Sequence, residues 1–170
     1  CRLAGEPIFA MVRGDRLGFA PWRVHPELEG VAAADYTAPR PLTRFRIRHT
    51  VGNSDPITGE DLPAERRVND GLPETLEEYI RADGLAYFKI KLSGERRHDL
   101  RRLARIWEVV SSGDSPHLAM PNLTMDANEA YGDLGEFEAF VNDLKSQQLG
   151  LFQHLLWIEQ PLPRRLTLDP

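Results

Sequence analysis

From residue 45 onward, short apolar segments alternate with amphipathic ones, and this order constrains the fold more than any other feature. The apolar segments have the length and period-two alternation of β-strands, and they span residues 45–51, 87–92, 118–125 and 155–159. The segments between them carry apolar residues at helical spacing, and they span residues 73–82, 97–111 and 134–148. Strands that alternate with helices pair in parallel through right-handed crossovers. The sequence therefore predicts an α/β fold with a parallel sheet.

The helix ends are predicted from turn-forming residues. Pro73 suits the first turn of the first helix, and Asp70 or the residues just after it are suited to cap it. Gly84 and Gly150 follow the first and third helix patterns. Because glycine adopts a left-handed backbone conformation readily, we expect both to stop their helices.

The spacing of the strand ends favours a particular α/β architecture. Asp126 follows Lys91 by 35 residues, and Glu159 follows Asp126 by 33. A (β/α)8 barrel of about 250 residues has close to this spacing per unit, so we expect about the first four β/α units of a TIM-type barrel. A doubly wound open sheet has similar spacing and stays an alternative. The glycine-rich patterns that would support a nucleotide-binding version do not occur.

The chain divides by composition near residue 42. Residues 21–43 contain prolines and polar residues typical of a connector and mark a possible domain boundary, and residues 43–170 hold the predicted half barrel. Residues 52–71 have neither a strand nor a helix pattern. A loop of this length is uncommon in compact domains, so we expect either a lid over the barrel mouth or an insertion.

Charge and cysteine content exclude several classes of protein. The formal net charge is −5 and the pI is about 5.6, which disfavours a globally basic nucleic-acid binder. No apolar run approaches the ~20 residues that span a bilayer. Cys1 is the single cysteine, so no intramolecular disulfide can form. We therefore expect a reducing compartment and a cytoplasmic location.

Charged residues stand near the predicted carboxyl ends of three successive strands. Lys89 and Lys91 lie two apart and share one face of a strand, and Asp126 and Asn128 do the same at the end of the next strand. Glu159 ends the last strand. Each has an ordinary explanation alone: lysines on a wet strand face, a turn or helix cap at Asp-Ala-Asn, and a solvated carboxylate.

Together these residues predict a site at the barrel mouth, the face that carries the chemistry in such barrels. Carboxylate oxygens from Asp126 and Glu159 suit a hard divalent cation, Mg²⁺ or alternatively Mn²⁺. The two lysines repel each other's charge, as a metal ion would repel both. We therefore expect their pKa values to be lowered from about 10.4, towards the range of a general base.

The strand at residues 45–51 supplies further candidates. We expect His49 to face the same mouth and to contact substrate, although a structural histidine is the ordinary reading. Arg44, Arg46 and Arg48 alternate with it and are expected on the other face of that strand. Their role is left open among a contact with a domain that caps the barrel, a contact with an acidic partner, and simple solvation.

The three strand ends jointly resemble those of the enolase superfamily. Residues 87–91 are similar to its Lys-x-Lys strand, residues 125–128 to its Asp-x-Asn strand end, and residues 157–162 to its Glu-Gln-Pro strand end. The branch that these motifs resemble is that of mandelate racemase and muconate lactonizing enzyme. Residues 1–9 are similar to the segment that closes the family's N-terminal capping domain, which implies that residues 1–42 are the end of that domain and a linker.

The resemblance implies a role for each matching residue. Lys91 would abstract the proton α to a substrate carboxylate, and Lys89 would hold that carboxylate and lower the pKa of its neighbour. Asp126 and Glu159 would bind Mg²⁺, with Asn128 as a supporting neighbour. A fixed cation beside the enediolate oxygens stabilises the transition state more than the ground state.

The resemblance also implies parts that this sequence does not contain, namely a third metal carboxylate on a fifth strand and a second acid/base on a later one. We therefore expect a fragment that is inactive alone, derived from a homo-oligomeric racemase, epimerase, dehydratase or cycloisomerase. The expected partner is a small-molecule carboxylate, and neither nucleic acid nor a membrane. The alternative is a non-catalytic α/β module, or an inactive homologue, that binds another protein chain.

Overall fold

The structure, a computed structural model, describes residues 2–112 and 120–167 and divides into two compact units. The first unit runs from Cys1 to Phe45 and the second from Arg46 to Pro170. The described helices of the first unit bury no residue fully, and they are α1 (Ile8–Arg13), η1 (Pro21–Arg23), η2 (Pro26–Leu28) and α2 (Ala33–Tyr36). Arg13 holds the end of α2 by donating through Nη1 to the carbonyl oxygens of Thr37 at 2.8 Å and Ala38 at 2.7 Å.

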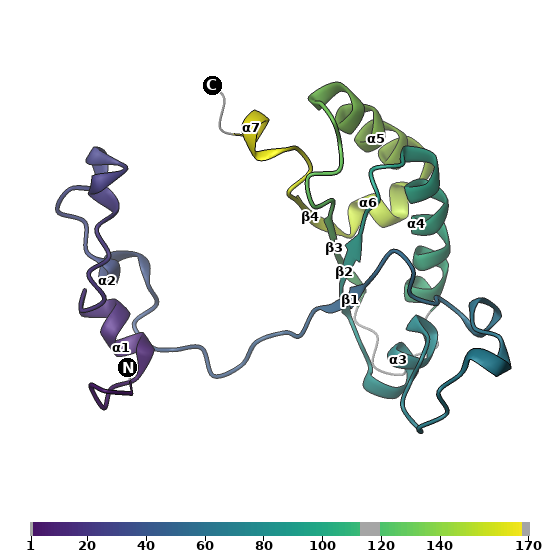
Figure 1. Cartoon of the computed structure of the whole chain (residues 1–170), viewed down its shortest axis with the longest axis horizontal. Coiled ribbons are helices and arrows are strands. Elements are labelled where there is room, and N and C mark those ends of the chain that lie inside the picture. Colours follow the sequence, from purple (N-terminus) through teal and green to yellow (C-terminus); the bar gives the residue numbers. More distant parts are fainter. Residues whose placement is uncertain (1, 113–119, 168–170) are drawn as a thin grey trace. The chain divides into compact units, whose positions relative to one another are not determined.

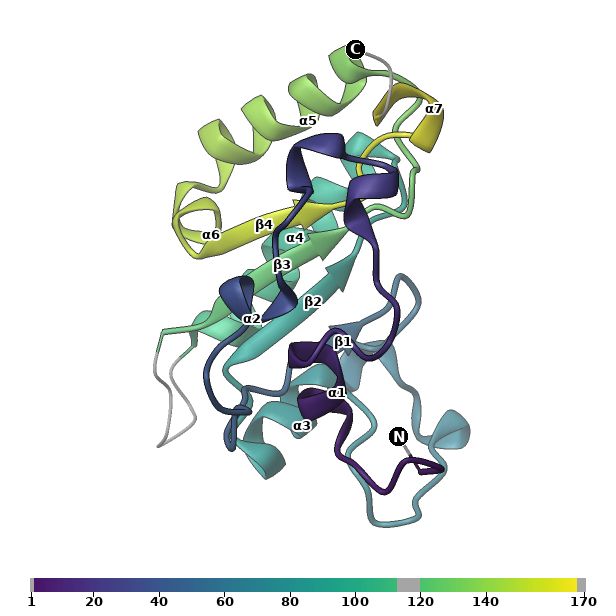
Figure 2. The ribbon, with the colours of Figure 1, turned by 90° about the vertical axis from the view of Figure 1, so that its left-hand side faces the viewer.

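The second unit contains an all-parallel sheet of four strands in the order β1-β2-β3-β4. The strands are β1 (His49–Val51), β2 (Tyr87–Lys91), β3 (Asn122–Asp126) and β4 (Leu155–Glu159). In Figure 2 the arrows of β2, β3 and β4 lie side by side and point the same way. The predicted α/β class and parallel sheet are therefore confirmed. Leu118 and Ala119, which the sequence assigned to the third strand, lie outside the described residues.

Helices cover one face of this sheet, as Figure 1 shows for α4, α5 and α6. The helices of the unit are α3 (Leu76–Asp83), α4 (Arg96–Ser111), α5 (Leu134–Gln147), α6 (Leu149–Gln153) and the short α7 (Arg164–Thr167). The core between sheet and helices includes the buried side chains Phe88, Ile90, Leu123, Met125, Leu103, Ile106, Phe140 and Leu144. Burial of each such side chain contributes about 1.5–3 kcal/mol. This packing leaves the alternate residues of each strand on the face away from the helices.

The first strand is shorter than predicted. The alternation of residues 45–51 predicted a strand throughout, but β1 contains only His49–Val51. Its residues pair with Phe88, Lys89 and Ile90 of β2, which itself begins at Tyr87. Residues 45–47 therefore have no neighbouring strand to pair with, whatever their propensity.

Helix α3 begins three residues later than its proline suggested. Thr75 is the N-cap, accepting a hydrogen bond from Glu78 N at 3.3 Å, while the Glu78 carboxylate accepts from Thr75 N at 3.3 Å. This reciprocal pair satisfies two of the helix's free N–H groups. The end of the helix is as predicted, because Gly84 adopts the left-handed conformation at φ 60° and ψ 40°.

The prediction that Gly150 ends the third helix is wrong. α5 ends at Gln147, Gln148 leaves the helical conformation, and Gly150 lies inside the next helix, α6. A Cβ atom at Gly150 would lie 3.3 Å from the indole of Trp107. The glycine therefore allows α6 to approach α4 closely.

The loop at residues 52–71 is attached to the helix layer. Arg102 of α4 donates through Nη2 to the carbonyl oxygens of Gly52 at 2.6 Å and Asp55 at 2.8 Å, and Arg105 pairs with Asp61 at 2.9 Å. Ile57 is buried. The loop also forms two short 3-10 helices, η3 (Gly59–Asp61) and η4 (Ala64–Arg66). These contacts favour an insertion over a lid. Among the described residues, no helix has the length and apolar character needed to cross a membrane.

Candidate functional site

The predicted site residues gather on the sheet face that the helices leave uncovered. Lys89 and Lys91 alternate with the buried Phe88 and Ile90, so they point away from the core. Lys91 is paired in register with Asp126, which is in turn paired with Glu159. Because paired residues of parallel strands share a face, the three lie side by side at the carboxyl ends of β2, β3 and β4.

Asp126 is the centre of this group. Its Oδ2 atom lies 2.7 Å from Nζ of Lys89 and 2.6 Å from Nζ of Lys91. Lys89 also contacts Oε1 of Glu159, so one ammonium group bridges carboxylates from two adjacent strands. The Asp126 side chain is only 2% exposed and that of Lys89 17%. The structure thus brings together Lys89, Lys91, Asp126 and Glu159.

Asn128 supports the same group from the loop after β3. Its Oδ1 accepts a hydrogen bond from Lys91 Nζ at 2.6 Å, and its backbone N–H donates to Asp126 Oδ1 at 3.1 Å. Asn128, Glu129 and Gln160 all have positive φ angles, 48°, 66° and 45°. Such conformations cost about 1–3 kcal/mol each outside glycine and are concentrated at functional sites. A hydrogen bond of 2.7 Å from Glu129 N to Gln160 O joins the two strand-end loops.

A buried anchor holds the loops behind the lysine strand. The Asp99 carboxylate accepts hydrogen bonds from Ser93 N at 2.9 Å, from Gly94 N at 3.0 Å and from the Tyr131 hydroxyl at 3.4 Å. Burial and the negative charge of Asp99 raise the pKa of Tyr131 well above its ordinary value. Ser93 and Gly94 follow β2 and Tyr131 follows β3, so this anchor fixes the loops next to Lys91 and Asn128.

His49 is not part of the group. It is paired in register with Phe88 and so lies on the helix-covered face, where its ring is tilted by 41° to that of Tyr79 of α3, with 4.7 Å between centroids. Partial burial lowers the pKa of His49 despite the charges of Asp55 and Asp83. A signal for this placement is present in the sequence, because His49 shares its face with the apolar Val51, which is buried.

Arg48 occupies the face that was expected for His49. Its Nη1 atom donates to Thr124 Oγ1 at 2.9 Å and lies 3.5 Å from Oε2 of Glu159. Its guanidinium carbon lies 5.5 Å from the ring centroid of Trp157. The expectation that the arginines lie on the face opposite the mouth is therefore wrong for Arg48. Side chains alternate along a strand, so His49 lies on the core face and its neighbour Arg48 lies on the face of the site.

The pKa of Lys89 is raised, whereas the sequence led us to expect a lowered value. Hydrogen bonds with Asp126 and then Glu159 raise the pKa of Lys89, and they outweigh its partial desolvation. Burial alone would raise the pKa of Asp126, but hydrogen bonds from Lys89 and Lys91 hold it well below its usual range. The repulsion between the lysines is smaller than the attraction of the carboxylates between them, so Lys89 is an ammonium ion at neutral pH.

Two carboxylates of the group, Asp126 and Glu159, are of the residue types that a divalent cation would need. Within residues 2–112 and 120–167, no three His, Cys, Asp or Glu side chains are grouped closely enough to hold a metal ion. Asp126 and Glu159 nevertheless turn one oxygen each towards a single cation, the ammonium of Lys89. Two hard oxygen donors that already share a cation fit Mg²⁺ in type and direction. Two carboxylates are fewer protein ligands than the three that the family resemblance implies.

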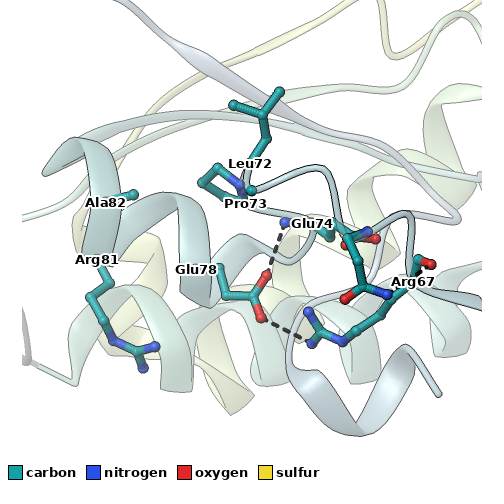
Figure 3. A pocket seen from close by; sticks show the side chains of 9 residues that line it. Arg67, Leu72, Pro73, Glu74, Glu78, Arg81 and Ala82 are labelled. Carbon is teal, nitrogen blue, oxygen red and sulfur yellow. Dashed lines mark hydrogen bonds and ion pairs between the residues drawn. The ribbon is translucent and has the colours of Figure 1, made fainter. Parts of the chain in front are cut away.

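A separate hollow lies beside α3, away from this group (Figure 3). Its walls include Arg67 and Glu78, paired at 2.9 Å, and Glu78 also accepts from Glu74 N at 2.9 Å. Arg81 at its rim pairs with Glu77 at 2.9 Å. Because these charges are paired with one another to cap the helix and hold the loop, the hollow presents no catalytic arrangement.

Comparison of the chain with protein-family models, with curated proteins and with solved structures returned no match.

Proposed function

We propose that this chain carries part of the site of a Mg²⁺-dependent enzyme that removes the proton α to a substrate carboxylate, as enolase-superfamily enzymes do. The reaction class is racemisation, epimerisation, dehydration or cycloisomerisation, which all share an enediolate intermediate. The observation that supports this proposal is the single ammonium of Lys89 shared by Asp126 and Glu159, with Lys91 on the same Asp126 oxygen. Two carboxylates and two amines converge there from three adjacent strands.

The proposed roles follow from the contacts. Asp126 and Glu159 would hold the metal ion, and the ion would supply positive charge next to the substrate carboxylate. Lys91 is the base that takes the α-proton, and Asn128 holds its amine by a 2.6 Å hydrogen bond. Binding of a divalent cation to the two carboxylates requires Lys89 to release them. Lys89 is then available for the substrate carboxylate, the role that the resemblance assigned to it.

The exposure of one sheet face supports the finer fold assignment, the first half of a TIM-type barrel. Parallel sheets are almost always covered on both faces. Here helices cover one face, while the other carries a polar and charged set, with Trp157 50% exposed. In a closed barrel that face is the interior, and its carboxyl-end rim is the site of catalysis.

A non-catalytic module that binds another protein chain is the second candidate function. The observation that favours it is the edge strand β4, where the adjacent Leu156 and Trp157 are 51% and 50% exposed. An unpaired edge with apolar side chains is suited to association with another chain. This candidate requires no metal ion.

Titration with Mn²⁺, followed by the electron paramagnetic resonance signal of the free ion, separates the two functions. We expect saturable binding, and at least tenfold weaker binding in Asp126→Asn and Glu159→Gln, a loss of about 1.4 kcal/mol. Asp143→Asn is the matched control, because that carboxylate pairs with Arg96 at 3.4 Å on the helix surface, away from the Asp126–lysine group. Absence of saturable binding, or equal binding by Asp126→Asn and the control, would overturn the enzyme proposal.

A further inference from the structure

We infer that the site takes an organic acid with a second anionic group, a carboxylate or a phosphate, and that Arg48 binds this second group. The inference rests on the proposed function, in which the first carboxylate lies at the Lys89 end of the site. It is carried by the geometry of Arg48 and by the charge of the sheet face around it.

Arg48 is held in place by groups that are themselves fixed. Thr124 accepts from Arg48 Nη1 and donates through its hydroxyl to Phe88 O at 3.2 Å, in the middle of the parallel sheet. The Thr124 side chain is buried. The ring of Trp157 lies beside the guanidinium, an arrangement that favours a cation. The arginine is therefore positioned before any ligand arrives, which reduces the entropy lost on binding.

Most of the hydrogen-bonding capacity of Arg48 is unused in the described part of the chain. Its hydrogen bond and its ion pair both run through Nη1. The contact with Glu159 is long, at 3.5 Å, and the Arg48 side chain is 30% exposed. A guanidinium has five N–H donors in a fixed fork, so Nε and Nη2 are free to bind a planar carboxylate or a phosphate through two hydrogen bonds.

The charge of this face differs in sign from that of the whole chain. The chain carries a formal charge of −5. On the open face, Arg48, Lys89 and Lys91 stand against Asp126 and Glu159, and Arg46 adds a fourth cation 5.9 Å from the ring centroid of Tyr87. The surplus is two positive charges. A bound divalent cation would increase this surplus. A dianion therefore balances more of the positive charge than an acid with one carboxylate does.

Trp157 also limits the shape of the acid. Its half-exposed ring adjoins Arg48, and it lies two residues before Glu159 on the same strand face. The ring thus offers an apolar surface between the arginine and the carboxylate–lysine group. The carbon skeleton that joins two anionic groups would lie against it.

Titration of the chain with three small acids tests this inference. The probes are succinate, phosphoglycolate and the monoanion butyrate, with saturating Mg²⁺ so that Lys89 can release its two carboxylates. Binding is followed by NMR through the indole N–H signal of Trp157, assigned with Trp157→Phe. We expect succinate or phosphoglycolate to bind at least tenfold more tightly than butyrate, and the tighter of the two identifies the second group. In Arg48→Met this preference disappears, and in Arg48→Lys it is reduced, because a lysine keeps the charge without the fork.

Arg101→Met is the matched control, because Arg101 is an exposed arginine on α4, on the helix side of the sheet; it should keep the preference. Circular dichroism verifies that each variant is folded. Equal binding of all three acids, no binding, or an unchanged preference in folded Arg48→Met would overturn the inference. The Mn²⁺ titration measures metal binding without any acid, so the two failures are distinguishable. Failure here with Mn²⁺ bound leaves the proposed function standing, whereas failure of Mn²⁺ binding overturns the proposed function and this inference with it.

Discussion

Removing the charge of Asp126 should destabilise the fold more than removing any exposed carboxylate. Asp126→Asn keeps the shape of the side chain but leaves the ammonium groups of Lys89 and Lys91, now 2.7 and 2.6 Å from Oδ2, without their shared anion. At an effective dielectric constant of 20, each contact is worth about 6 kcal/mol of Coulomb energy before desolvation is subtracted. Breaking a buried ion pair by removing one partner costs about 3–5 kcal/mol in practice.

The expected cost lies at the lower end of that range, at about 3 kcal/mol. Lys89 keeps its contact with Glu159, and the Lys91 side chain, 28% exposed, can turn towards water. Urea unfolding followed by circular dichroism measures this cost, and with a slope of about 2 kcal/mol/M the midpoint should fall by about 1.5 M. Asp143→Asn, at an exposed pair, should cost under about 0.5 kcal/mol. If Asp126→Asn costs no more than Asp143→Asn, the Asp126–lysine group is not held as described.

Two further predictions concern the pH dependence and the backbone. The pKa values of Asp126, Asp61 and Glu78 are lowered in the fold by their hydrogen bonds and ion pairs. These carboxylates therefore stabilise the fold fully above their unfolded pKa values near 4, and the free energy of unfolding should fall below about pH 5. Urea unfolding at a series of pH values measures this, and the fall should be shallower in Asp126→Asn. An equally steep fall with pH in both proteins would contradict the lowered pKa of Asp126. Gly94→Ala should cost about 1–3 kcal/mol more than Gly71→Ala in thermal unfolding. Both glycines have positive φ, 84° and 89°, but only at Gly94 would the new Cβ meet a neighbour, Ala130 O at 2.7 Å, so equal costs would argue against the close approach of the two loops.

The sequence predicted the parts of the fold that depend on local pattern. Residues 87–91 and 155–159 form strands as expected, because a neighbouring strand pairs with each of them along its length. The shared face of Lys89 and Lys91 follows from strand geometry alone. The prediction of a strand at residues 45–47 failed because no residues of β2 pair with them, and a strand exists only where a neighbour pairs with it.

Other features depend on tertiary contacts that no local pattern records. Gly150 has the sequence signal of a helix stop, but the approach of Trp107 decides its place inside α6. The raised pKa of Lys89 depends on two carboxylates that lie 37 and 70 residues further along the chain. The faces on which Arg48 and His49 lie could have been predicted from the sequence, because the apolar Val51 indicates which face of β1 is buried.

The most direct test of the shared cation position is a crystal structure of the chain with Mn²⁺, located by its anomalous scattering. Our account predicts one peak in contact with both Asp126 and Glu159, with the Lys89 ammonium displaced from between them. Crystals that hold Mn²⁺ only elsewhere, with Lys89 still bridging the two carboxylates, would contradict it.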